Sequence, residues 1–196
     1  MNTINKHHEQ PALLKGEGIP DFKEVTPSQI SKYFPTFLDE LNNQFNKIEE
    51  SLEKSLHSNQ SLTWDEVMTP LLELGERLRW SWGVISHLNG VCNSPELREV
   101  YSAQQPEVIR LSNRMGQSKI IYNSLCNLKE YSGPILERTQ IRILDSELLS
   151  MNQRGVGLNE SEQEKFNSDS EYLAKLSTEF SNNVLDATNN WSLLLT

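Results

Sequence analysis

Apolar side chains recur every three to four residues along most of this 196-residue chain, which is the spacing of one face of an α-helix. Strict alternation of apolar and polar residues is absent, so no segment is predicted to form a strand. The pattern predicts an all-α protein of about six or seven helices. Several exceed the average of about 11–12 residues, so we expect an elongated multi-helix bundle of long, kinked helices.

The first half of the chain carries two clear helix starts. Thr26-Pro27 is one, because proline suits a first turn that does not use its N–H. Thr63-Trp64-Asp65-Glu66 is the other, a capping box in which each end residue satisfies the backbone N–H of the other. We expect a break or kink near Pro35, a kink at Pro70, and a separate short helix over 84–91. The two stripes comprise Ile30, Phe34, Phe37, Leu41, Phe45, Ile48, Leu52 and Leu56, and then Trp64, Val67, Leu71, Leu74 and Leu78.

The second half predicts three further helices. One long helix begins at Ser94-Pro95-Glu96, bends near Pro106 and ends at Ser132-Gly133-Pro134. The next is followed by the turn Arg154-Gly155-Val156-Gly157-Leu158, whose two glycines are free to take a positive φ. Asn159 with Glu162 caps a last helix that runs to the terminus. The stripes are Leu97, Tyr101, Val108, Leu111, Met115, Tyr122, Leu125 and Leu128; Ile135, Ile141, Leu144, Leu148 and Met151; and Leu176, Phe180, Val184, Ala187, Trp191 and Leu194.

The two ends of the chain differ from its middle. Residues 1–25 contain helix-breaking glycines and prolines and predict an extended N-terminal segment, whereas residues 26–196 predict the helical region. No glycine, proline or basic last turn closes the final helix, and Leu193, Leu194 and Leu195 have no visible partner. We therefore expect that the helical region is truncated at its C-terminal end.

The composition excludes several classes of function. The chain carries 18 basic and 27 acidic residues, and its net charge of −9 argues against binding to nucleic acid or an anionic membrane. No apolar run approaches the roughly 18 residues of a membrane span, and the first residues do not resemble a secretory or organellar leader. Cys92 and Cys126 are expected to be free thiols in a reducing compartment. We therefore expect a cytoplasmic protein.

A set of short motifs occurs in order along nearly the whole chain. Together they resemble the oligopeptidase A and thimet oligopeptidase family of zinc metallopeptidases, most closely its oligopeptidase A branch, and only the N-terminal region of such enzymes. The motifs are Pro11-Ala12-Leu13-Leu14, Gly18-Ile19-Pro20-Asp21-Phe22, Thr63-Trp64-Asp65, Ser86-His87-Leu88-Asn89, Asn93-Ser94, Glu96-Leu97-Arg98-Glu99, Gly155-Val156-Gly157-Leu158, and LSTEFSNNVLDATNNW over 176–191.

This resemblance implies a helical enzyme that cleaves short peptides at one zinc ion in a deep channel. The family's ligands come from a His-Glu-x-x-His helix and a later glutamate, in which the first glutamate activates the zinc-bound water. Here His8-Glu9 is the only His-Glu pair, and Ala12 follows it where the second histidine would stand. We therefore expect no catalytic, cofactor-binding or metal-binding residue in this chain, and we expect any zinc to be held by the rest of the enzyme.

Other residues invite a chemical role that the sequence does not support. His87 is expected to be a buried or half-buried histidine that hydrogen-bonds a neighbouring helix, and His7-His8 to be a terminal pair without a preformed site. The segment Arg154-Gly155-Val156-Gly157 lacks the Gly-Lys-Ser/Thr of a phosphate loop. Cys92 and Cys126 are expected to fill apolar space. A solvated helix face is expected for Glu49, Glu50, Glu53, Asp65 and Glu66, and core packing for Trp64, Trp80, Trp82 and Trp191.

The leading hypothesis is a non-catalytic N-terminal portion of an oligopeptidase A-like zinc metalloendopeptidase that forms one wall of the substrate channel. Its partners would be a catalytic C-terminal half, in the same or a separate chain, and short peptides as substrates of the full enzyme. The alternative is a stand-alone helical binding or adaptor module derived from a truncated peptidase.

Overall fold

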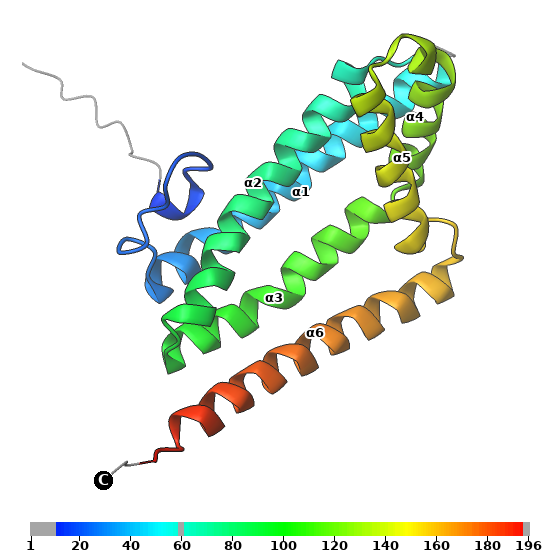
Figure 1. Ribbon diagram of the computed structural model, residues 1–196. Coiled ribbons are helices and arrows are strands. Elements are labelled where there is room, and N and C mark those ends of the chain that lie inside the picture. Colours follow the sequence, from blue (N-terminus) through cyan, green and yellow to red (C-terminus); the bar gives the residue numbers. More distant parts are fainter. Residues whose placement is uncertain (1–10, 59–60, 194–196) are drawn as a thin grey trace, which may run out of the picture.

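Six α-helices form the part of the protein that the computed structural model describes, residues 11–58 and 61–193 (Figure 1). No strand occurs within those ranges, which confirms the predicted all-α class. Short helical turns lie at Ala12–Leu14 (η1), Leu128–Ser132 (η2) and Gly133–Ile135 (η3). The helices are α1 (Pro27–His57), α2 (Trp64–Val91), α3 (Pro95–Gly116), α4 (Lys119–Asn127), α5 (Arg138–Gln153) and α6 (Glu160–Asn189).

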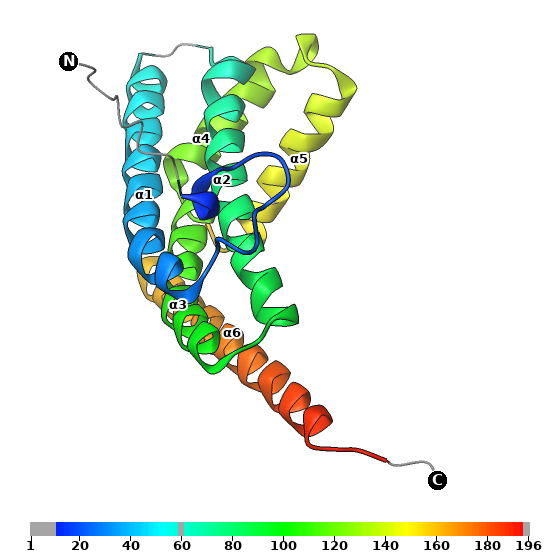
Figure 2. The same ribbon diagram turned by 90° about the vertical axis from the view of Figure 1, so that its left-hand side faces the viewer.

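Helix α1 is the centre of the packing, since it contacts α2, α3 and α4. Its predicted apolar stripe faces these neighbours, and Ile30, Phe34, Leu41 and Phe45 are fully buried. In Figure 2, α1 and α2 run side by side, and η1 with its loop lies against α2. Leu13 of η1 is buried there. Burial of these large side chains supplies most of the stability of α1.

Three helices pass through an internal proline without interruption, so the break considered near Pro35 does not occur. A proline removes one hydrogen bond to the carbonyl four residues earlier. The three carbonyls that lose this partner belong to exposed residues, so water can replace the missing N–H. They are those of Ser31 in α1, Glu66 in α2 and Ser102 in α3, each four residues before a proline.

Three predicted helix boundaries were wrong. Residues 84–91 are the last turns of α2 rather than a separate helix, because Gly83 lies on the exposed side and does not interrupt it. The long helix predicted after Ser94 is divided into α3 and α4, since the Ser118 hydroxyl accepts from the Ile121 N–H at 3.2 Å and starts a new helix. Ile135 is 86% exposed and precedes α5.

The predicted turn between α5 and α6 is confirmed, but only one of its glycines takes a positive φ. Gly155 has φ = 84°, and the Val156 N–H donates to the Met151 carbonyl at 3.1 Å, which closes the end of α5. The Asn159–Glu162 capping box then starts α6, as predicted. These contacts determine the direction in which α6 leaves the bundle.

Substitution of Gly155 by alanine should destabilise the fold, whereas the same change at Gly157 should not. At position 155 the new Cβ would lie 2.6 Å from Leu158 Cδ1, in a backbone conformation that costs L-residues about 1–2 kcal/mol. At position 157 nothing lies within 4 Å. Urea denaturation followed by circular dichroism should therefore separate the two variants, and equal stabilities would contradict this account of the turn.

Substitution of Thr63 by alanine should lower the free energy of unfolding by about 1 kcal/mol. The Thr63 hydroxyl donates to the Glu66 carboxylate at 2.7 Å and the Thr63 N–H donates to it at 2.8 Å. These bonds hold the pKa of Glu66 below its ordinary 4.5, so the stabilisation is present above that pH and is lost as the pH falls through the lowered pKa.

The matched control is Thr36→Ala, at an exposed interior position of α1, which should change the stability by less than about 0.5 kcal/mol. Denaturation at pH 7 and at pH 3 tests both statements. A Thr63→Ala effect that does not shrink at low pH would show that the carboxylate contributes nothing to the cap.

Candidate functional site

Several of the residues that carry the family resemblance meet where α6 passes the corner between α2 and α3. Arg98 Nη2 lies 2.6 Å from Asp186 Oδ1, and Arg98 Nη1 lies 2.8 Å from Asp186 Oδ2, so the guanidinium donates to both carboxylate oxygens. Arg98 Nε also donates to Asn93 Oδ1, and Asn93 Nδ2 donates to the Asn89 carbonyl at 2.8 Å. We call Asn89, Asn93, Arg98 and Asp186 the corner network.

The electrostatics of the corner network favour both charges. The hydrogen bonds from Arg98 lower the pKa of Asp186, and the carboxylate in turn raises the pKa of Arg98. Their side chains are 26% and 50% exposed, so solvent screens the pair. A bidentate geometry in a partly open position fastens α6 to the bundle and provides no acid or base for chemistry.

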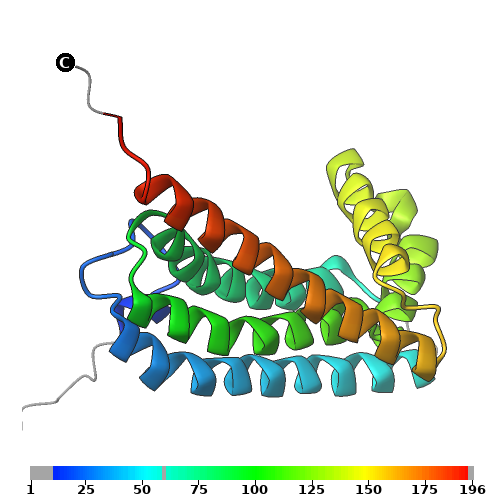
Figure 3. The same ribbon diagram turned by 90° about the horizontal axis from the view of Figure 1, so that it is seen from below.

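Along the rest of its length α6 packs on α3 through polar side chains. Helix α3 lies between α1 and α6 (Figure 3). None of the 30 residues of α6 is buried. This seam was not predicted from the sequence, although polar or small residues at positions 167, 171, 174, 178 and 182 show its helical spacing. The seam pairs are Arg110–Glu171 at 3.1 and 3.2 Å, Gln105–Thr178 at 3.0 and 3.2 Å, and Gln117–Asn167 at 2.9 and 3.2 Å.

The apolar stripe predicted near the C-terminus lies on the other side of α6 and faces solvent. The exposed fractions are 65% for Leu173 and 71% for Phe180, and both Leu176 and Val184 are also exposed. We call Leu173, Leu176, Phe180 and Val184 the apolar face of α6. The helix ends at Asn189 instead of running to the terminus, so Trp191 lies beyond it, and Leu194 and Leu195 fall outside the described residues.

A groove of about 1030 Å³ lies between α2 and α5. Its floor is apolar and includes Phe45, Met68, Ile121, Leu125 and Met151. Its rim is charged and includes Glu73, Glu76, Arg79, Glu147 and Arg154. An apolar floor with charged edges of both signs can hold a peptide or a helix, but it presents no nucleophile paired with a base.

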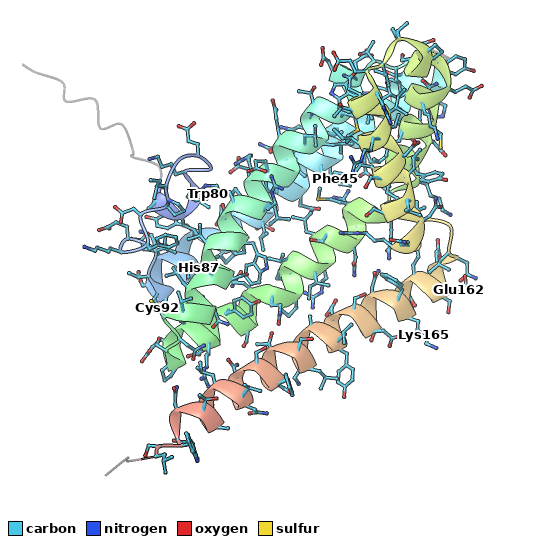
Figure 4. All side chains as sticks on the ribbon, viewed as in Figure 1. Phe45, Trp80, His87, Cys92, Glu162 and Lys165 are labelled. Atoms are coloured by element: carbon cyan, nitrogen blue, oxygen red, sulfur yellow. The ribbon has the colours of Figure 1, made fainter. Side chains whose placement is uncertain are left out.

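His87 is exposed, so the expectation of a buried, hydrogen-bonded histidine was wrong. It lies on the outer side of α2 (Figure 4), and its ring centre is 5.5 Å from that of Phe22. This contact joins two of the family-like motifs, Gly18–Phe22 and Ser86–Asn89, which are far apart in the sequence. The arrangement assigns His87 a packing role at the N-terminal loop.

The other candidates divide into packed and exposed residues. Trp64, Trp80 and Trp82 pack against the core as predicted, and Trp82 stacks at 4.7 Å on Tyr101. Trp191 is 71% exposed, so it is not a core anchor. Cys126 is half-buried, but Cys92 is exposed and therefore does not fill apolar space.

Glu49 also departs from its prediction as part of a solvated face. Its carboxylate is half-buried, lies 2.7 Å from Arg114 Nη2 and accepts from the Ser118 hydroxyl at 2.6 Å. The Arg114 guanidinium lies 4.8 Å from the ring centre of Phe45. Glu49 thus joins α1 to the end of α3 and the start of α4. Glu50, Glu53, Asp65 and Glu66 are exposed, as predicted.

The described residues do not fit a metal site. Within 11–58 and 61–193, no three histidine, cysteine, aspartate or glutamate side chains are placed to share an ion. A zinc site of the expected family needs three protein ligands, so no step of zinc chemistry can be assigned to these residues. His7 and His8 lie outside the described ranges. In the same ranges, no helix combines the length and apolar content needed to cross a bilayer.

Comparison with known proteins gives a consistent result. Residues 34–163 match the family described as Neurolysin/Thimet oligopeptidase, N-terminal domain. The chain is 33% identical to oligopeptidase A of Haemophilus influenzae over 185 residues, which are 93% of this chain and 26% of that protein. It is 32% identical to the organellar oligopeptidase A of Arabidopsis thaliana, over 94% of this chain and 22% of that protein. The chain therefore spans about a quarter of the length of these curated relatives.

Removal of the Arg98 side chain should loosen the C-terminal half of α6 and leave the bundle intact. In Arg98→Ala, the α6 amides after Thr178 should exchange with solvent several-fold faster, because the bidentate contact with Asp186 is lost. In the unmodified protein the same loosening should appear as the pH falls through the lowered pKa of Asp186. Hydrogen exchange read by mass spectrometry measures both effects.

The control is Arg79→Ala, which removes an arginine whose ion pair within the described residues is with Glu76, a neighbour in its own helix. Exchange in α6 should then stay unchanged. Equal acceleration in the two variants, or acceleration across α1 and α3 in Arg98→Ala, would show that the corner network does not act locally on α6.

Proposed function

The chain belongs to the neurolysin and thimet oligopeptidase N-terminal domain family, and we propose that it is the non-catalytic helical portion of an oligopeptidase A-like zinc metalloendopeptidase. One observation carries this proposal: the similarity covers 93–94% of this chain but only 22–26% of the length of the relatives. In such an enzyme, zinc and its ligands would lie in the remaining three quarters.

In this enzyme the helical portion would form one wall of the channel that admits peptides. Long helices that pack side by side, such as α1, α2 and α3, make a rigid surface. The groove between α2 and α5 adds an apolar strip with charged edges, which suits contact with an extended peptide or with a helix of the rest of the enzyme. The role of this portion would be to restrict access to short, unfolded peptides.

A second candidate is a stand-alone helical binding module. It is favoured by the position of the core, because every buried apolar side chain in the described residues lies between Leu13 and Val156. The buried apolar side chains of the described residues thus come from η1, from α1 to α5 and from the segments beside these helices, and none comes from α6. Under this alternative the chain would fold and bind a peptide without contributing to catalysis.

A chimera separates the two candidates. The matched quarter of Haemophilus influenzae oligopeptidase A is replaced by residues 1–196 of this chain, and cleavage of a short quenched-fluorescence peptide is measured with and without a zinc chelator. We expect chelator-sensitive cleavage by the chimera and none by residues 1–196 alone, because the ligands would come from the remainder.

The matched control replaces the same quarter with an unrelated helical bundle of equal length, which should give no cleavage. A chimera that folds, as judged by a cooperative thermal transition, and yet cleaves no peptide would overturn the proposal in favour of the stand-alone module.

A further inference from the structure

We propose that the apolar face of α6 is the surface on which the zinc-binding remainder of the same enzyme docks. This inference rests on the proposed function and adds to it a specific contact surface: Leu173, Leu176, Phe180 and Val184. Helix α6 then belongs structurally to the part that follows, and the bundle of α1 to α5 binds it from the other side.

The extent of the similarity places α6 at a domain boundary. The match to the N-terminal domain family ends at residue 163, in the first turns of α6, which begins at Glu160. The similarity to the relatives nevertheless covers 93–94% of the chain, and the uncovered 6–7% is less than half the length of the 30-residue α6. Most of α6 is therefore shared with proteins that are about four times longer, although it lies beyond the residues that match the N-terminal domain family.

The orientation of α6 supports the same conclusion. An amphipathic helix of a single domain normally turns its apolar side toward the core. Here the polar side carries the contacts with α3, including Arg110–Glu171 and Arg98–Asp186, and Leu173 and Phe180 point away from it. A row of large apolar side chains on the surface costs free energy in water, and its burial by a second domain would recover it.

The charge of α6 argues against a second copy of this chain as the occupant. The helix carries seven acidic and only two basic side chains, Lys165 and Lys175. Two copies packed through this face would bring two acidic helices together, which is unfavourable. The occupant that fits is an apolar patch bordered by lysine or arginine, supplied by the remainder of the enzyme.

Thiol labelling tests the surface directly. Phe180→Cys places a thiol in the centre of the apolar face, and Ser168→Cys places one at an exposed position of α6 outside both the apolar face and the α3 seam. Each substitution is made in residues 1–196 and in the chimera with Haemophilus influenzae oligopeptidase A. Peptide mass spectrometry then reads the alkylation rate at the introduced thiol, so the other cysteines do not interfere.

In residues 1–196 both thiols should react rapidly. In the chimera the thiol at position 180 should react at least about tenfold more slowly. The reaction rate of the thiol at position 168 should change by less than about twofold. An active chimera with an unprotected position 180 would overturn the docking surface and leave the proposed function standing. A folded but inactive chimera would instead overturn the proposed function.

Two further outcomes have a defined meaning. Protection of position 180 in residues 1–196 that grows with protein concentration would identify a second copy as the occupant and overturn the proposal. If the chimera does not fold, the same substitution goes into intact Haemophilus influenzae oligopeptidase A at the position aligned with Phe180, where protection supports the docking surface and free reaction overturns it.

Discussion

The structure depends on the burial of the apolar stripe of α1 against α2 and α3. Phe34 and Phe45 are fully buried on that stripe, and Trp82 of α2 lies between Phe34 and Tyr101 of α3 in a stack of rings. Since this one helix contacts both neighbours, the positions of α2 and α3 follow from it. Close packing of large side chains makes the arrangement unique, because a shifted helix would leave cavities.

This arrangement leaves α3 with one side for α6, and that side is polar. Arg98, Gln105 and Arg110 project from it and bind the polar stripe of α6. Exposed ion pairs and hydrogen bonds contribute modest free energy. The seam therefore fixes the direction of α6 but adds little to the stability of the fold. The same helix can therefore belong to the bundle on one side and offer an apolar surface on the other. This division follows from the polar surface of α3, which binds the polar stripe of α6 and leaves the apolar face of α6 in solvent.

The helices and the family could be predicted from the sequence, while the candidate site could be predicted only in part. The caps at Thr26, Thr63 and Asn159 and the stripe of α1 were correct because they depend on residues within one or two helical turns. The seam of α6 was missed, since the pairing of Gln117 with Asn167 joins residues that only the fold brings together. Glu49 was misassigned for the same reason, because Arg114 lies 65 positions away.

The sequence by itself determined where α1, α2, α3 and α6 begin, which residues form the stripe of α1, and that no His-Glu-x-x-His segment is present. Only the tertiary structure decided which stripe is covered. The stripes of α1 and α6 have the same periodicity, yet Phe34 is fully buried and Phe180 is 71% exposed. Periodicity records that a helix has an apolar side, but burial depends on which surface lies opposite, and that is a property of the whole packed chain.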